Sequence, residues 1–324
     1  MIQINRFFCL LLATVMLVAA GCTSSKRVST SSNTKNAVKG LPKMPKTDPL
    51  PAITSDPNSL LWEITGNGLE QKSYLYGTIH MIEKKDFFMT DVTKDRFNRT
   101  QVLFLELDMD DPSLMFKGLM GVFMNGGVTL KDLVTEEEYQ RIDDYFKEQT
   151  GSGIAMFNRM KPMLVSAMVQ EKSMTGEVTS YEAEFMELAN KRGMEVEGLE
   201  TAEFQMSMFD SIPYEQQAQM LLDGVDGKDG MNSEELFKEM IALYKAEDVN
   251  GLASIISEES KDMENFERLL LETRNRNWIP IISKQSAIMP TFFAVGAGHL
   301  GGENGVIKLM QEAGYTMTPI KQVK

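Results

Sequence analysis

Short apolar runs near both ends of residues 58 to 324 flank a long stretch with helical periodicity. Apolar residues dominate or alternate in segments 60–64, 73–79, 101–107, 194–199, 291–295 and 315–320. Their lengths and compositions are typical of β-strands, and Gly66-Asn67-Gly68 marks a loop between the first two. The pattern therefore predicts strands from both ends of this region.

Helices are predicted between and beside these strands. Apolar residues recur at three- and four-residue spacing in segments 136–149, 162–172, 181–192, 233–246 and 265–283. A further helix is expected over 304–313, and Gly193 and Gly314 are expected to end two of the helices. Helices that alternate with strands predict an α/β fold with a central mixed sheet covered by helices. The 25 methionines favour core filling, with an adaptable peptide-binding surface as the alternative.

The first 57 residues have the pattern of an exported lipoprotein. Residues 1–21 combine a short basic start with an apolar run too short to span a membrane, as in a signal peptide. Ala19-Ala20-Gly21 precedes Cys22 as in a lipobox, so we expect Cys22 to be lipidated. Residues 22–57 are rich in Ser, Thr, Lys and Pro and predict a disordered tether. The chain is thus expected to be lipid-anchored in the cell envelope, at the outer membrane in a Gram-negative host. Plain secretion after cleavage near Ala20 is the alternative.

Charge and cysteine content narrow the function of residues 58–324. The net charge of the chain is −13, and the segment before residue 58 is basic, so the remainder is strongly acidic. Nucleic acid is therefore excluded as a partner. The two cysteines are Cys9 and Cys22, which leaves the folded region without a disulfide, a thiol nucleophile or a thiolate metal site. The oligomeric state has no signal in the sequence.

The chain has only two histidines, and each closes the same four-residue pattern. His80 ends Gly77-Thr78-Ile79-His80, and His299 ends Gly296-Ala297-Gly298-His299, each after an apolar strand. Neutral imidazole is a common metal ligand and a general base near neutral pH. Gly77, Gly296 and Gly298 would let the backbone approach a bound group closely or adopt positive φ. Ordinary structural histidines at strand ends are the alternative.

Two carboxylates lie at strand ends as well, Glu106 and Glu200. If the strands are neighbours, both histidines and both carboxylates meet at the carboxyl edge of the sheet. Such a set suits a divalent ion such as zinc, manganese or cobalt, with an open position for water. Arg274, inside a predicted helix, could hold a substrate carboxylate or an oxyanion. From spacing alone, a surface ion pair with Glu272 or a neighbouring helix is favoured for it.

Four segments together resemble the TraB/GumN family, in the order that the family has them. They are Leu61 to Ile64 with Ser73 to His80; Gly198 to Thr201 with Gln205; Arg274-Asn275 with Trp278; and Val295 to Gly301 with Gly305 and Gly314-Tyr315. The resemblance spans residues 58 to 320 and makes 58–324 one TraB/GumN-like domain. Many members have Glu directly before the Arg-Asn pair, whereas this chain has Thr273 there.

The family includes the TIKI metalloproteases, which are built around two Gly-x-x-His motifs. The resemblance implies an α/β fold whose core sheet has two halves that each supply one histidine. It also implies that His80, Glu106 and His299 hold a metal ion, with Glu200 and Arg274 as partners and Asn275 in support.

Three hypotheses remain open. The leading one is an envelope-anchored metal-dependent hydrolase, a peptidase acting on a peptide or polypeptide, in which Glu106 or Glu200 is the general base. The second is a non-catalytic protein that binds a secreted peptide or glycan at the cell surface. The third is an envelope scaffold whose histidines only hold the sheet together. The sequence has no His-Glu-x-x-His, Gly-x-Ser-x-Gly or phosphate-loop motif that would favour another enzyme class.

Overall fold

The computed structural model describes residues 58–173, 176–227, 233–260 and 268–322. The expected signal peptide, Cys22 and tether lie outside the described residues and stay predictions. Within the described ranges, no helix is both long and apolar enough to cross a membrane.

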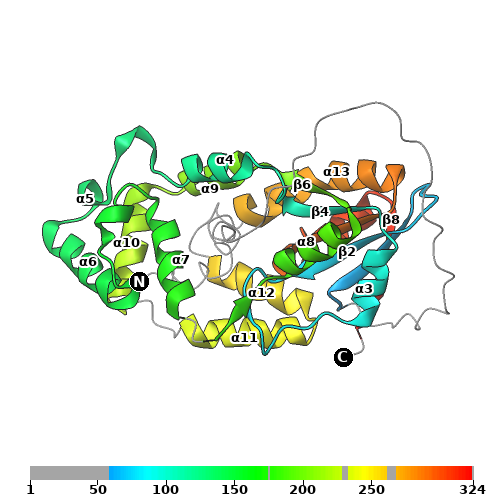
Figure 1. Ribbon diagram of the computed structural model, residues 1–324, viewed down its shortest axis with the longest axis horizontal. Helices are drawn as coiled ribbons and strands as arrows, with labels where there is room; N and C mark the ends of the chain where they lie inside the picture. The colour runs from blue at the N-terminus through cyan, green and yellow to red at the C-terminus, as the bar shows by residue number, and fades with distance from the viewer. Residues whose placement is uncertain (1–57, 174–175, 228–232, 261–267, 323–324) are drawn as a thin grey trace.

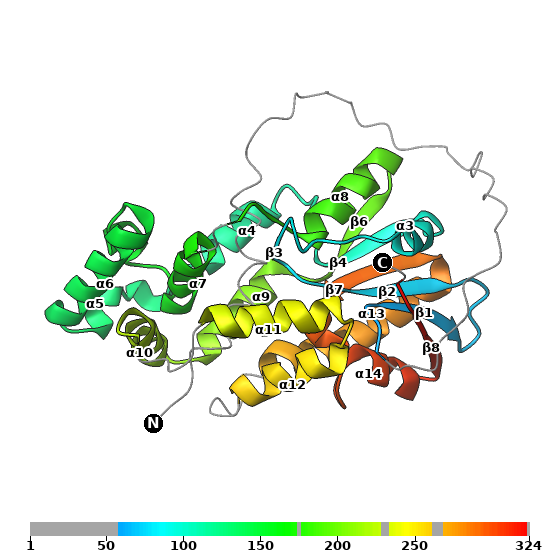
Figure 2. The same ribbon diagram turned by 90° about the horizontal axis from the view of Figure 1, so that it is seen from below.

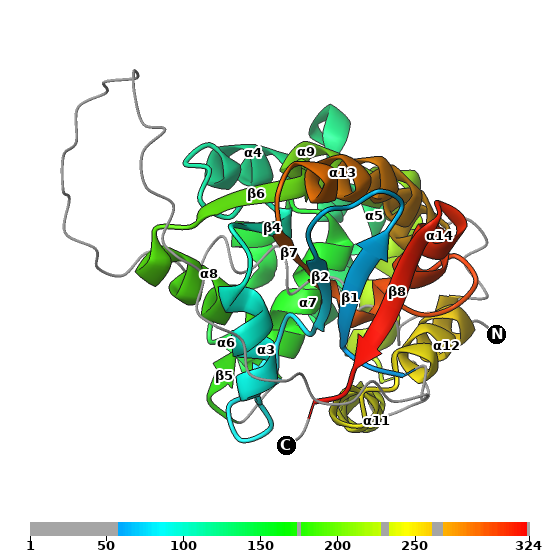
Figure 3. The same cartoon turned by 90° about the vertical axis from the view of Figure 1, so that its right-hand side faces the viewer.

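A six-stranded mixed sheet forms the centre of the fold, in the order β6-β4-β7-β2-β1-β8. The strands are β1 (Leu61–Gly66), β2 (Ser73–Thr78), β4 (Val102–Leu107), β6 (Glu195–Glu200), β7 (Thr291–Gly296) and β8 (Tyr315–Ile320). Figure 3 shows them side by side. Every predicted strand is present, which confirms the expected mixed α/β sheet covered by helices. A separate two-stranded sheet pairs β3 (Ile82–Glu83) with β5 (Val178–Thr179).

The direction of the strands decides where their ends meet. β6, β4, β7 and β2 are mutually parallel, whereas β1 at one side of them is antiparallel to both of its neighbours, β2 and β8. β2 and β7 come from opposite ends of the domain sequence and are direct neighbours, with Thr78 opposite Gly296. The two Gly-x-x-His motifs therefore leave the sheet at the same edge, as do Glu106 and Glu200.

Helices cover both faces of the sheet (Figure 2). α3 (Asp91–Asn98) and α8 (Tyr181–Arg192) lie on one face, where Phe97 and Phe185 pack against Phe292 of β7. α13 (Arg274–Ile288) and α14 (Val306–Glu312) lie on the other and contact β6, β7 and β8. Burial of these apolar side chains, each contributing about 2 kcal/mol, is the main force that holds the layers together.

A second, helical part projects from the sheet beyond its carboxyl edge (Figure 1). It contains α4 (Leu114–Gly121), α5 (Leu130–Leu133), α6 (Glu136–Thr150), α7 (Pro162–Ser173), α9 (Ala202–Met208) and α10 (Tyr214–Val225). Its cores include the buried Met163, Met206, Met208 and Met220, so core filling is confirmed for these methionines. α11 (Ser233–Lys245) and α12 (Val249–Ser260) run back from it towards the sheet.

Several observed helices have no counterpart among the predictions. They are α3, α4, α5 and α9, which have eight residues or fewer, and the longer amphipathic helices α10 and α12. The predicted helix 265–283 begins outside the described residues. Its described part starts as a π-helical segment, η4 (Arg268–Thr273), and continues as α13 to Ile288, past Pro280. Gly193 closes α8 with φ of 61°, as expected for a glycine cap.

Candidate functional site

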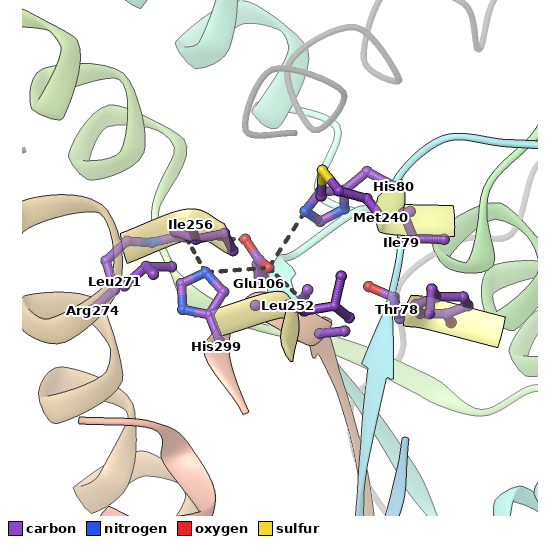
Figure 4. A pocket seen from close by; sticks show the side chains of 14 residues that line it. Thr78, Ile79, His80, Glu106, Met240, Leu252, Ile256, Leu271, Arg274 and His299 are labelled. Carbon is purple, nitrogen blue, oxygen red and sulfur yellow. Dashed lines mark hydrogen bonds and ion pairs between the residues drawn. The ribbon is translucent and has the colours of Figure 1, made fainter. Parts of the chain in front are cut away.

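The predicted site residues converge at the carboxyl edge of the parallel strands. His80 lies two residues beyond β2, and His299 lies in the short 3-10 turn η5 (Ala297–His299) after β7. Glu106 of β4 lies between them, with its Oε1 3.6 Å from Nε2 of His80 and 3.9 Å from Nε2 of His299. Figure 4 shows both imidazoles directed towards this carboxylate. Glu200, the last residue of β6, lies behind Arg274 and contacts it.

Arg274 is the central cation of this cluster. Its side chain is 1% exposed, so the surface ion pair with Glu272 favoured by spacing alone is wrong. The guanidinium donates to both oxygens of Glu200 through Nε, at 2.9 and 3.1 Å, and to Oε2 of Glu106 at 2.5 Å. It also packs over the ring of Trp278, 4.9 Å from the centroid. Arg274 is buried because β4 and β6 place their terminal carboxylates against the first turn of α13, which spacing within one helix cannot reveal.

His80 is held by a carboxylate on the far side of its ring. Its Nδ1 lies 2.8 Å from Oε1 of Glu182 in α8, and Oγ1 of Thr78 donates to the same oxygen at 2.6 Å. A carboxylate accepts hydrogen bonds, so Nδ1 carries a proton. The arrangement directs the other nitrogen, Nε2, towards Glu106.

His299 is held in the same orientation by a neutral group. Its Nδ1 lies 2.6 Å from Oδ1 of Asn275, whose Nδ2 donates to the backbone carbonyl oxygen of Asn304 at 2.8 Å. The Asn275 amide is thereby oriented with its oxygen towards the imidazole, so Nδ1 of His299 donates. Its Nε2 faces a guanidinium nitrogen of Arg274 at 3.0 Å and accepts from it. This geometry requires a neutral imidazole with its proton on Nδ1.

The pKa values of the two imidazoles are consequently shifted in opposite directions. Burial lowers the pKa of His80, but the adjacent Glu182 carboxylate outweighs it and raises the pKa to about 9. Burial and then the charge of Arg274 hold the pKa of His299 well below its usual range. Two histidines with the same local motif therefore differ in charge at neutral pH.

The pKa values of the Glu106 and Glu200 carboxylates are also shifted in opposite directions. Burial would raise the pKa of Glu106, but Arg274, both histidines and the backbone N–H of Gly296 lower it well below its usual range. For Glu200 burial prevails over Arg274 and the pKa is raised. Gln205 bridges the pair, donating to Glu106 at 3.2 Å and to Glu200 at 2.9 Å, and Trp278 donates to Glu200 at 3.1 Å.

The glycines of both motifs provide close approach rather than unusual dihedral angles. None of Gly77, Gly296 and Gly298 is among the positive-φ glycines of the described chain. A Cβ on Gly296 would lie 3.3 Å from both Oε1 of Glu106 and Nε2 of His80. The bare backbone N–H of Gly296 instead donates to Glu106 at 2.8 Å. A Cβ on Gly77 would press on Ala297 and Leu300, so this glycine lets η5 pack against β2.

A small cavity of about 50 Å³ opens onto this cluster. Its polar lining includes His80, Glu106, Arg274 and His299, and the rest is largely apolar (Figure 4). Glu200 and Glu182 do not line it. A second hollow of about 470 Å³ is polar and borders Asn275; the two share Leu271 and Gly298 in their linings.

Sequence reasoning missed Glu182. It was absent from the candidates because an acidic residue in the first turn of a helix is ordinarily read as a favourable partner of the helix dipole. A signal was present, however: Glu182, Phe185 and Ala189 share one face of α8, and all are buried. A carboxylate on an otherwise apolar helix face requires a buried partner.

Two separations in the cluster would suit a divalent ion. Ligands about 2.1 Å from a tetrahedral ion lie roughly 3.4 Å apart, close to the separations between Glu106 and each histidine. Both Nδ1–H groups have acceptors, as is usual for metal-binding histidines. Within the described ranges, however, no group of three or more His, Cys, Asp or Glu side chains is placed so that it could hold a metal ion. To bind an ion, Nε2 of His299 would first have to lose the hydrogen bond that it accepts from Arg274.

Comparison with known proteins points in the same direction. The chain is 24% identical to Metalloprotease TIKI1 of Danio rerio, over 83% of this chain and 65% of that protein. It is 25% identical to Metalloprotease TIKI2 of Danio rerio, over 82% and 61%, and 22% identical to Metalloprotease TIKI1 of Homo sapiens, over 81% and 62%. The chain thus spans less than two thirds of the length of these relatives. No solved structure matches it.

The model of the TraB/PrgY/gumN family matches residues 60–319, from the residue before β1 to the penultimate residue of β8. The match includes all of the six-stranded sheet except Ile320, and every residue of the cluster around Glu106. On this evidence the chain belongs to the TraB/PrgY/gumN family.

Proposed function

We propose that the protein is a metal-dependent peptidase whose site is the cluster around Glu106. The observation that carries the proposal is the common orientation of the two histidines. Each has its Nδ1–H fixed by a buried acceptor, and each directs Nε2 at the same carboxylate oxygen. A merely structural histidine needs one such partner, whereas two converging Nε2 atoms suit a shared ion.

His80, His299 and Glu106 would hold the ion, which is manganese, cobalt or zinc by donor type. When bound, such an ion supplies Lewis acidity and lowers the pKa of a water molecule. Glu106 supplies the one carboxylate among the described residues that line the cavity, and it is ionised, so its Oε1 is placed to bind the ion. Glu200 is outside the lining, and its role is to hold Arg274.

Arg274 would stabilise negative charge that develops on a substrate carbonyl oxygen. It lines the cavity, and the nitrogen that donates to His299 is the one an ion would release. Glu200 and Trp278 hold the rest of the guanidinium, so it would stay at the site once its Nη1 had withdrawn from His299. The polar hollow that adjoins the cavity gives an extended polymer room to continue, which favours a peptide over a compact metabolite.

The proposal is tested on the full chain purified without chelator. Elemental analysis should find about one divalent ion per chain, and the ion should be lost in His80→Ala and in His299→Ala. A peptide pool should be cleaved with added manganese, cobalt or zinc, and chelator should abolish cleavage. Glu247→Gln is the matched control, because Glu247 is a buried carboxylate outside the site that accepts from Ser59.

Absence of bound ion, together with no rise in melting temperature when manganese or cobalt is added, would contradict the proposal. Peptide binding that survives both histidine substitutions would instead favour the non-catalytic binding protein. Loss of stability in the two variants, with no ion and no binding to lose, would favour the scaffold.

We also propose that the protein is exported and attached to the envelope by lipid on Cys22. The support is the pattern of residues 1–22 in the sequence. Cys22→Ser should move the chain from the membrane fraction to the soluble fraction, and metabolic labelling with a fatty acid should disappear. Unchanged fractionation and labelling would contradict the anchor.

A further inference from the structure

The cavity has two chemically different walls. One consists of the charged and imidazole side chains around Glu106. The other is mainly aliphatic and comes from four segments: Ile79 after β2, Met240 of α11, Leu252 and Ile256 of α12, and Leu271 of η4, with Tyr244 of α11 also in the lining. Figure 4 shows Ile256 and Leu271 beside Arg274, and Met240 beside His80. A bond that reacts at the polar wall therefore has an apolar surface next to it.

The size of the cavity limits what the apolar wall can receive. Its volume is about 50 Å³ in all, and one water molecule needs roughly 10–15 Å³ on this measure, so only a small group fits. The side chains of valine, leucine, isoleucine and methionine have three or four non-hydrogen atoms. An indole ring is too large for this space, and a glycine would leave it empty.

The chemistry of the wall excludes charged side chains. Met240 is fully buried, and Leu252 and Ile256 are 2% and 6% exposed, so a group placed against them loses its water. A lysine or aspartate side chain placed against this wall would lose hydration, and none of the aliphatic side chains offers it a partner.

Gly298 and Ile256 together set the width of the cavity. A Cβ on Gly298 would overlap with Cδ1 of Ile256, so the side chain of Ile256 rests directly on the backbone of the second Gly-x-x-His motif. Shortening Ile256 widens the cavity. Adding a methyl group at Gly298 displaces the flexible end of Ile256 and narrows it.

We propose that this apolar wall is a specificity subsite for an aliphatic side chain next to the scissile bond of the peptide substrate. The proposal rests on the proposed function for the reaction. The subsite itself is a binding surface that exists whether or not the reaction occurs. The substrates are accordingly peptides with valine, leucine, isoleucine or methionine beside the scissile bond.

Binding is measured first, on the full chain, with N-acetyl amino acid amides of glycine, valine, leucine, tryptophan, lysine and aspartate. The chain has only two histidines, so the imidazole NMR signals report occupancy of the cavity directly. Valine and leucine amides should bind at least fivefold more tightly than the other four. Ile256→Ala should improve tryptophan amide binding at least fivefold, and Gly298→Ala should weaken leucine amide binding by a similar factor.

Ile255→Ala is the matched control, since Ile255 is the neighbouring residue of α12, packs against the main core and does not line the cavity. It should leave all six affinities within twofold. If Ile256→Ala does not fold, Gly298→Ala tests the same cavity in the opposite direction. Equal binding of all six amides, or preferences unchanged in the folded variants, would overturn the subsite.

Cleavage of the peptide pool separates the two proposals. Cuts beside aliphatic residues, shifted towards aromatic residues in Ile256→Ala, support both. Cuts without residue preference sustain the peptidase and refute the subsite. Selective amide binding without any cleavage sustains the subsite and refutes the peptidase.

Discussion

The ends of β2 and β7 carry the same motif, lie side by side, and yet hold their histidines in different states. At the end of β2, a carboxylate supports His80 and raises its pKa to about 9. At the end of β7, an amide supports His299 and a guanidinium faces it, so its pKa is well below the usual range. The difference shows that the motif fixes position, whereas α8 and α13 fix charge.

The difference would also give the two histidines separate tasks if the proposed ion binds. The carboxylates beside His80 make its imidazole more basic, which would increase its donor strength but would require loss of a proton from Nε2. His299 would need no proton loss but would have to give up the hydrogen bond from Arg274. Binding of the proposed ion would thus be coupled to a proton at His80 and to Arg274 at His299.

Substitution of Arg274 should have the largest effect on stability and on the difference between the two histidine pKa values. Arg274→Leu leaves Glu106 and Glu200 buried without their cation, which should cost about 3–5 kcal/mol in the free energy of unfolding. The pKa of His299 should rise towards that of His80, because its opposing charge is gone. Urea denaturation and imidazole NMR measure the two effects.

Arg276→Leu is the control for this substitution. Arg276 is exposed on the same helix and donates to Asn304 at 2.7 Å, so its loss should change stability by less than about 1 kcal/mol. Equal destabilisation by the two variants would mean that the buried guanidinium is not the central cation of the site.

The metal-free chain should lose stability in alkali as His80 loses its proton. Its folded pKa of about 9 exceeds the ordinary value, so folding favours the protonated form. The contribution is complete below pH about 6.5 and is lost as the pH rises through about 9; the shift corresponds to about 3 kcal/mol. Denaturation midpoints from pH 6 to 10 should show the decline. A curve that Glu182→Gln leaves unchanged would show that His80 is not its source.

Changing the residues that contact Nδ1 of the two histidines should bring the two pKa values closer together. Glu182→Gln should lower the pKa of His80 by one unit or more, and Asn275→Asp should raise that of His299 by a smaller amount, since Arg274 still opposes it. Titration of the two imidazole signals by NMR measures both. If Glu182→Gln moves the His299 signal as much as that of His80, the supports are not local.

The smallest effect is expected at Thr78. It donates to Glu182, and its partner across the β2–β7 pair is Gly296, which has no side chain. Thr78→Val removes one hydrogen bond from a buried carboxylate and should cost about 1–2 kcal/mol in unfolding free energy. Thermal or urea denaturation checks the value, and Thr65→Val, at an exposed hydrogen bond of β1, should cost less.

The strands and their terminal residues could be predicted because each is a local signal. An apolar run followed by Gly-x-x-His, or ending in a glutamate, can be read without knowing its neighbours. Strand order cannot be read this way, since the pairing of β2 with β7 depends on packing between distant segments. The burial of Arg274 and the role of Glu182 were likewise set by tertiary contacts, and these determine the electrostatics of the site.

The pairing of β2 with β7 also constrains how the chain matures. Residues 73–78 and 291–296 must meet before the two imidazoles share a carboxylate, so nearly the whole polypeptide has to be synthesised first. A nascent or prematurely terminated chain contains one histidine of the pair and cannot chelate an ion through both. Any chemistry that needs both histidines would therefore have to wait until residue 299 has been synthesised and β7 has paired with β2.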